Sequence, residues 1–159
     1  MGINIRAMNQ EDKPSIMQIL RSTAEFKRSE VIVAEEVIDS YLSDSYRSGY
    51  HILVAELNST IAGYICFGPT PLTEGTWDIY WVVVAPDKQR KGVGSALLES
   101  AEKSIRETGG RLAIIETSST PAYEKTRHFH IRYGYEVIGC ITDFYAPGDD
   151  KLILQKRLR

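Results

Sequence analysis

The chain has 159 residues, 43% of them hydrophobic, and this size suits one domain over residues 1–159 with its own core. A formal net charge of −2 argues against non-specific nucleic-acid binding, and no apolar run reaches the roughly 18 to 20 residues of a membrane span. Without a signal-peptide segment at the N-terminus, we expect a cytoplasmic protein. Its two cysteines, Cys66 and Cys140, lie in apolar runs and are expected to be buried thiols.

Apolar spacing and breaker residues predict alternating strands and helices. In chain order the predicted elements are strand 2–6, a helix that starts at 9–14, a helix around 34–42 after a polar linker at 27–30, strands 51–57 and 61–67 joined as a hairpin, strand 77–84, helix 91–107, strand 112–115, helix 120–132, and strands 135–145 and 151–158. The order β-α-α-β-β-β-α-β-α-β-β predicts an α/β fold, with a mixed central sheet of about seven strands flanked by four helices. The helical crossover makes the strand at 112–115 parallel to the strand at 77–84.

The most informative stretch is Gln89-Arg90-Lys91-Gly92-Val93-Gly94, between an apolar strand and an amphipathic helix. Backbone N–H groups at the start of a helix attract anionic oxygens, so this turn is expected to bind phosphate. A P-loop would need a Lys-Ser or Lys-Thr pair after the glycines, and none follows. A dinucleotide-binding turn would need a third small residue where Leu97 stands. Glu116 imitates the acidic ribose ligand of that fold, but too few strand–helix units follow.

The pattern Gln/Arg-x-x-Gly-x-Gly/Ala is met at all three of its defined positions, Gln89, Gly92 and Gly94. It resembles the pyrophosphate loop of the GNAT family of N-acetyltransferases, which bind acetyl-coenzyme A. The predicted order of elements is similar to the fold of that family along nearly the whole chain. The glycine-containing turn and the order of the elements are independent features of the sequence, and both point to the same family.

Residues 123–135 resemble a second segment of that family, Asn-x-x-Ala-x-x-Phe-Tyr-x-x-x-Gly-Phe/Tyr. Phe129, Gly134 and Tyr135 agree with this pattern, whereas Tyr123, Thr126 and His130 depart from it. Tyr123 replaces an asparagine that commonly contacts the pantetheine arm of the cofactor. His130 replaces a tyrosine thought to protonate the leaving thiolate.

The resemblance implies that acetyl-coenzyme A is the co-substrate. It implies a bulge in the fourth strand, at Val82–Val84, whose free N–H faces the acetyl oxygen while the strand pairs with the pantetheine arm. Arg90 and Lys91 would add positive charge near a phosphate, unless they are merely solvated. The predicted cofactor-binding residues are Val82, Val83, Val84, Gln89, Arg90, Lys91, Gly92, Val93, Gly94, Ser95 and Tyr123. No cluster of residues has metal-ligand spacing, so no metal is indicated.

Asp78 is the first candidate for the general base that accepts the amine proton. It lies eleven residues before Gln89, the spacing of the catalytic glutamate in histone-type members of the family. Strand alternation is expected to place Asp78, Tyr80, Val82 and Val84 on one face. The alternative for Asp78 is an ordinary surface carboxylate. Glu116 is the second candidate, and it could equally pair with a basic neighbour.

His130 is the candidate acid, because an imidazole with a reference pKa of about 6.5 can donate a proton to the thiolate. In the alternative, His130 is a partly exposed helix residue and the thiolate leaves unaided. His128 is expected on the solvent side of the same helix.

The acceptor is expected between the first two helices and the last hairpin, at residues 23–30 and 143–150. Their carboxylates and aromatic rings would suit a cationic amine, and the candidate substrate-binding residues are Glu25, Phe26, Tyr80 and Tyr145. The predicted enzyme moves an acetyl group from acetyl-coenzyme A directly to a primary amine of a small molecule or peptide, with general acid and base help. The alternative is a non-catalytic coenzyme A-binding sensor or interaction module. No nucleic-acid or membrane partner is expected, and a homodimer stays open.

Overall fold

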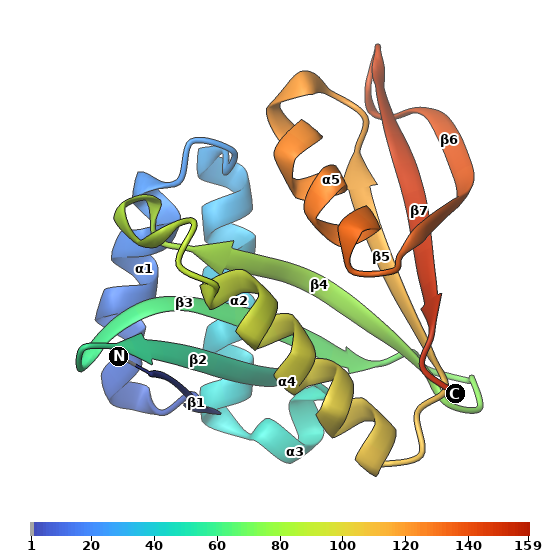
Figure 1. Cartoon of the computed structure of the whole chain (residues 1–159). Coiled ribbons are helices and arrows are strands. Elements are labelled where there is room, and N and C mark those ends of the chain that lie inside the picture. Colours follow the sequence, from blue (N-terminus) through green and yellow to red (C-terminus); the bar gives the residue numbers. More distant parts are fainter. Residues whose placement is uncertain (1) are drawn as a thin grey trace.

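The computed structural model describes residues 2–159, so Met1 lies outside the description. Helices cover both faces of a central sheet (Figure 1). The strands are β1 (Ile3–Ala7), β2 (His51–Leu57), β3 (Thr60–Pro69), β4 (Thr76–Val84), β5 (Leu112–Ser118), β6 (Glu136–Ala146) and β7 (Asp149–Arg157). The helices are α1 (Lys13–Ser22), α2 (Arg28–Ser43), α3 (Ser45–Ser48), α4 (Val93–Glu107) and α5 (Glu124–Arg132), with short 3-10 turns η1 (Gln10–Asp12), η2 (Pro86–Lys88) and η3 (Pro121–Tyr123).

The seven strands form one mixed sheet in the order β1-β2-β3-β4-β5-β7-β6. Strands β1 to β4 pair antiparallel in sequence, and β5 then runs parallel to β4 after the α4 crossover. β7 lies between β5 and β6 and pairs antiparallel with both. The predicted fold class, strand count and parallel pair are confirmed. Within residues 2–159, no helix combines the length and the apolar content needed to cross a membrane.

Two local features differ from the predicted helices, and each has a capping residue as its cause. α2 begins at Arg28, inside the stretch predicted as a linker, because the carboxylate of Glu30 accepts a hydrogen bond from the N–H of Lys27 at 3.2 Å. The short α3 was not predicted. It starts where Asp44 accepts a hydrogen bond from the N–H of Arg47 at 3.1 Å, and it ends at Gly49, whose φ of 74° favours glycine.

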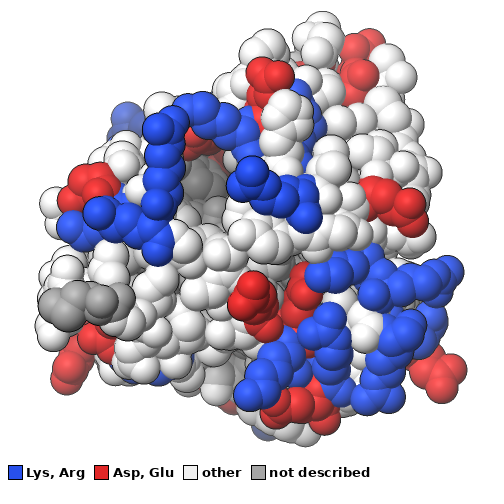
Figure 2. Space-filling view, viewed as in Figure 1, with Lys and Arg blue, Asp and Glu red and all other residues white. Residues whose placement is uncertain are grey.

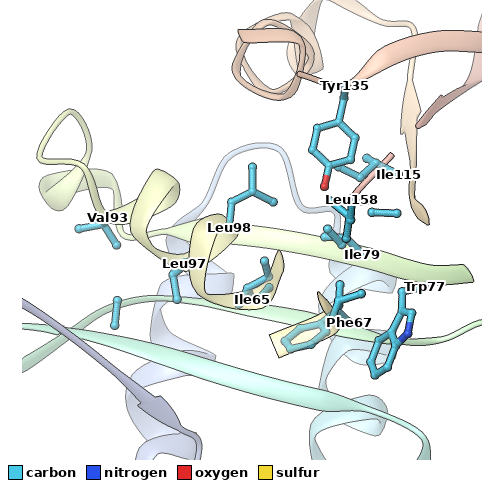
Figure 3. Packing of buried hydrophobic residues seen from close by; sticks show 14 of the residues in the cluster. Ile65, Phe67, Trp77, Ile79, Val93, Leu97, Leu98, Ile115, Tyr135 and Leu158 are labelled. Carbon is cyan, nitrogen blue, oxygen red and sulfur yellow. The ribbon is translucent and has the colours of Figure 1, made fainter. Parts of the chain in front are cut away.

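The first four strands have a hydrophobic core on each face of the sheet. On one face, α4 packs Leu97 toward the sheet, where Ile65 and Phe67 of β3 belong to the same buried cluster, and Leu98 points toward Tyr135 (Figure 3). The buried residues on the other face belong mainly to α1, α2, β2 and β3: Met8, Ile16, Met17, Ile19, Leu20, Ala34, Ile38, Ile52, Val54, Tyr64, Cys66, Val83 and Ala85. Burial of both faces explains why β3 reads as a nearly continuous apolar run.

Residues 112–158, which hold β5, α5, β6 and β7, form the C-terminal arm. Tyr135 reaches from this arm into the α4 core (Figure 3), where its hydroxyl donates to the buried Glu102 carboxylate at 2.8 Å. Lys156 of β7 donates to the same carboxylate at 2.8 Å, so Glu102 ties α4 to the arm. β6 is the edge strand and has no buried residue. The prediction of two buried thiols therefore holds for Cys66 of β3 but is wrong for Cys140 of β6, which is exposed.

Candidate active site

The main feature of the site is the place where β4 and β5 separate. The two strands pair only at four positions, from Thr76 opposite Leu112 to Ile79 opposite Ile115. Beyond them the strands diverge (Figure 1), so residues 81–84 of β4 pair with β3 on one side and, within residues 2–159, with no strand on the other. Figure 2 shows a hollow in this region, between the loop that precedes α4 and α5, with Lys and Arg side chains along its rim. The open strand edge offers backbone N–H and C=O groups to a ligand.

The bulge predicted at Val82–Val84 lies earlier in β4. Trp81 pairs with Cys66 and Ile79 pairs with Phe67, so Tyr80 is the extra residue. The prediction that Asp78, Tyr80, Val82 and Val84 share one face is therefore wrong. The bulge shifts the alternation, so Val82 and Val84 pack toward the α4 core together with Ile79. Asp78, next to Ile79, points to the opposite face.

The turn before α4 has the local structure that an anion site requires. Gly92 is the N-cap with φ of 81°, a left-handed conformation that favours glycine, and no side chain among residues 2–159 caps the helix. The N–H groups of the first turn of α4 are therefore not used by a capping side chain. Gln89, Arg90 and Lys91 are exposed beside this turn. Gly94 is closely packed, since an added Cβ would lie 3.3 Å from the Phe129 ring, which would have to shift slightly.

Asp78 and Glu116, the two candidate bases, lie on the same face at the point where the strands separate. Asp78 pairs in register with Ile114, which shares its face of β5 with Glu116. The hydroxyl of Thr70 donates to Asp78 at 2.7 Å, whereas Lys151 forms a 3.1 Å ion pair with Glu116. Burial, with contributions from Asp78, Tyr50, Cys66 and Glu116, raises the pKa of Tyr80 to about 12. Tyr80 therefore lies close to both carboxylates.

His130 is buried rather than partly exposed. Its side chain is only 3% exposed, and its ring lies edge-on to Phe129 and Tyr135 at centroid distances of 5.2 and 5.8 Å. The Nδ1 atom is buried without a hydrogen-bond partner in residues 2–159. Burial lowers the pKa of His130 to about 4, so the imidazole is neutral near pH 7. The partly exposed position is therefore wrong, whereas the predicted exposure of His128 is confirmed.

The candidate acceptor residues gather on the face that carries Asp78 and Glu116. Burial raises the pKa of Tyr145, and the charges of Glu116, Asp149 and Glu30 raise it further. The single proton of the Tyr123 hydroxyl is shared between two acceptors, the backbone oxygen of Glu25 at 3.1 Å and the Glu30 carboxylate at 3.2 Å. The structure therefore brings two substrate candidates, Glu25 and Tyr145, into one neighbourhood, with Phe26 adjoining Glu25 in the chain.

Sequence reasoning did not single out Glu30, Tyr50, Thr70 or Lys151, although each contacts or neighbours a candidate residue. Glu30 had a usable signal, because an acid three residues after a helix N-cap is typical of a capping box. The other three depend on pairing across the sheet or on side-chain approach, which no spacing within the chain indicates.

Comparison with known proteins places this geometry in a family. Residues 13–135 match the description Acetyltransferase (GNAT) family. The chain therefore belongs to the GNAT family of acetyltransferases, as its resemblance predicted. Comparison with curated proteins gave no match.

Solved structures share the fold over nearly the whole chain. A GNAT-family protein from Desulfovibrio desulfuricans is 38% identical, with a TM-score of 0.95 over 99% of this chain and 100% of that one. The PaiA N-acetyltransferase from Thermoplasma acidophilum, solved with coenzyme A, is 18% identical, with a TM-score of 0.78 over 99% of both chains. A ribosomal-protein-alanine N-acetyltransferase from Brucella melitensis is 24% identical, with a TM-score of 0.78 over 97% of this chain and 99% of that one. Membership of the family supports acetyl-coenzyme A as the co-substrate.

Proposed function

We propose that this protein transfers the acetyl group of acetyl-coenzyme A to a primary amine of a small molecule or peptide. The observation that carries the proposal is the separation of β4 from β5. It joins three features in one place: an uncapped helix start beside basic residues, an open strand edge, and two carboxylates on the opposite face of the sheet. A cofactor bound along one side would meet an amine arriving from the other.

The chain's own residues fit such a cofactor. The first N–H groups of α4, with Arg90 and Lys91 beside them, would hold its pyrophosphate. The edge at residues 81–84, which includes Val82, Val83 and Val84, would pair with its pantetheine arm. Bound acetyl-coenzyme A supplies the acetyl group as a thioester. A backbone N–H of this edge would stabilise the charge that develops on the acetyl oxygen, as an oxyanion hole does.

Asp78 is the base we favour for the amine proton. A primary amine with an ordinary pKa near 10.4 arrives mostly protonated at neutral pH, so a group on the enzyme must accept a proton. Lys151 forms an ion pair with Glu116 at 3.1 Å, whereas within residues 2–159 Asp78 accepts a hydrogen bond only from the neutral Thr70 hydroxyl. Asp78 is therefore the freer acceptor, directly or through one water. The burial and low pKa of His130 favour departure of the thiolate without its help.

A binding and transfer experiment tests this function. Acetyl-coenzyme A should raise the melting temperature by ligand linkage, whereas NAD should not, and an amine library should show acetyl transfer. Replacing both Arg90 and Lys91 by alanine should weaken acetyl-coenzyme A binding about tenfold, because two charges near phosphate are lost. Lys103→Ala, an exposed change farther along α4, is the matched control. Binding without transfer to any amine would favour the sensor alternative, and a shift with NAD alone would contradict the proposal.

A further inference from the structure

Tyr123 connects two distant parts of the chain. It ends the 3-10 turn η3 in the C-terminal arm, and its hydroxyl lies 3.1 Å from the backbone oxygen of Glu25 and 3.2 Å from a carboxylate oxygen of Glu30. Glu25 lies in the loop between α1 and α2, which we call the acceptor loop (residues 23–27). Burial, then Glu30, raises the pKa of Tyr123, so the hydroxyl stays protonated and donates. One side chain of the arm therefore holds a loop of the N-terminal part.

The acceptor loop is fixed at both ends as well as in the middle. At its start, the Thr23 hydroxyl donates to the Ile19 oxygen at 2.7 Å, and the N–H of Phe26 donates to the Thr23 oxygen at 3.2 Å. At its end, one oxygen of Glu30 accepts from the N–H of Lys27, while the other accepts from Tyr123. Glu30 therefore serves the start of α2 and the link to the arm at once. Without Tyr123, the second oxygen of this carboxylate would lose its donor.

This link lies beside the groups expected to meet the amine. Tyr123 lies in η3, which directly follows β5, the strand that carries the candidate base Glu116. The charges of Glu116, Asp149 and Glu30 also raise the pKa of Tyr145, in agreement with this placement. Tyr123 also stands where the family commonly has the asparagine that contacts pantetheine. In this chain the hydroxyl is instead directed to the acceptor loop. The direction of the Tyr123 hydroxyl therefore favours a role in binding the acceptor over a role in binding the cofactor.

We propose that Tyr123 is a positioning residue that holds the acceptor loop and the Glu30 carboxylate as one wall of the amine site. This inference rests on the proposed acetyltransferase function. Tyr123 acts through the loop, and it sets how well the amine is held without taking part in the chemistry. A cationic amine benefits from a carboxylate fixed in place, because ordering that side chain on binding would cost affinity.

The test is Tyr123→Phe, which keeps the ring and removes both hydrogen bonds. The KM for the acetylated amine should rise about fivefold to tenfold, the size expected for loss of a typical intramolecular hydrogen bond. The kcat and the dissociation constant of acetyl-coenzyme A should stay within twofold. Tyr133→Phe is the matched control, because Tyr133 packs on Phe129 at the end of α5 and its hydroxyl makes no hydrogen bond with residues 2–159. An unchanged or lower KM would overturn the proposal, and so would a loss of acetyl-coenzyme A affinity.

A second measurement separates this proposal from the proposed function. In Tyr123→Phe, amide hydrogen exchange should increase in residues 23–30 and stay unchanged in α4, whether or not an amine substrate is known. If exchange increases there but no amine is acetylated by the parent protein, the proposed function fails and the positioning of the loop stands. If exchange in residues 23–30 is unchanged, Tyr123 does not hold the loop, and the inference is wrong even for an active enzyme.

Discussion

Strands β3 and β6 are both apolar in sequence, yet the structure places them in opposite surroundings. Every residue of β3 from Ala62 to Gly68 is buried, whereas β6 has no buried residue. The reason is the number of covering layers. Helices α1 and α2 cover one face of the first four strands and α4 covers the other, but in the C-terminal arm β6 lies at the sheet edge (Figure 1). The N-terminal part is therefore packed on both faces, whereas the arm leaves its edge strand exposed.

The largest expected effect comes from a matched pair of isoleucines in the two strands. Ile65 of β3 is fully buried, and Ile141 of β6 is 45% exposed. Ile65→Ala should lower the free energy of unfolding by about 3 to 4 kcal/mol, because it leaves a cavity in a packed core. Ile141→Ala should change it by less than about 1 kcal/mol. Urea unfolding of both variants measures the difference. Equal losses would mean that β6 is covered in solution, as it would be in a homodimer formed through the arm.

A smaller effect on the free energy of unfolding, confined to acidic pH, should come from His130, which is buried against Phe129 and Tyr135 in the arm. Burial lowers the pKa of His130 to about 4, below its value of about 6.5 in an unfolded chain. The folded state then binds fewer protons, so this contribution to stability is complete above pH 6.5 and is lost as the pH falls toward 4. Relative to His130→Phe, the parent should lose roughly 2 to 3 kcal/mol between pH 6.5 and 4.

Urea unfolding at several pH values measures this difference. His128→Phe, on the exposed side of α5, should keep the parent's pH dependence. A His130→Phe variant with the same pH dependence as the parent would show that water reaches the imidazole. The arm would then be more open than the structure shows, and a role for His130 as an acid would regain support.

The smallest effect is chemical and leaves the fold intact. Cys140 of β6 is exposed and Cys66 of β3 is buried, so a maleimide should label one thiol in the folded chain and a second only after unfolding. Burial raises the pKa of Cys66, and the pKa of Cys140 is also raised, by desolvation and by Asp150. Labelling of Cys140 should therefore be slow at neutral pH and faster at alkaline pH. Mass spectrometry counts the labels, and Cys140→Ser should remove the first. Rapid labelling of both thiols in native protein would contradict the two-sided burial of β3.

Much of this fold was predictable because its signals are local. The strand at His51–Leu57 was predicted with the bounds that the structure has, and α4 was displaced by only two residues at its start. Burial was harder to predict. The apolar run around Cys140 shows the same β preference as the run around Cys66, and only the position of β6 at the sheet edge decides that it is exposed.

The part of the candidate site formed by a local backbone turn was predictable, whereas the part that depends on how the strands pair was harder to predict. The turn at Gln89–Gly94 follows from its glycines and the helix behind it. Simple strand alternation predicted Asp78 and Val82 on the same face of β4, but the bulge at Tyr80 places them on opposite faces. His130 and Tyr123 depart from the family motif, so the motif did not indicate their contacts. His130 contacts Tyr135 and Tyr123 contacts Glu30 because separate elements pack together in the fold.

The contact between Gly94 and Phe129 has an evolutionary consequence. The family pattern accepts glycine or alanine at position 94, but here a methyl group would lie 3.3 Å from the Phe129 ring. The two positions share one small volume, although they belong to segments that look independent in the sequence. An alanine at the first position should therefore need only a small shift of the Phe129 ring, whereas a larger side chain there should be accompanied by a smaller residue at the second. The helix that packs beside the phosphate-binding turn thus restricts which residues the turn can accept.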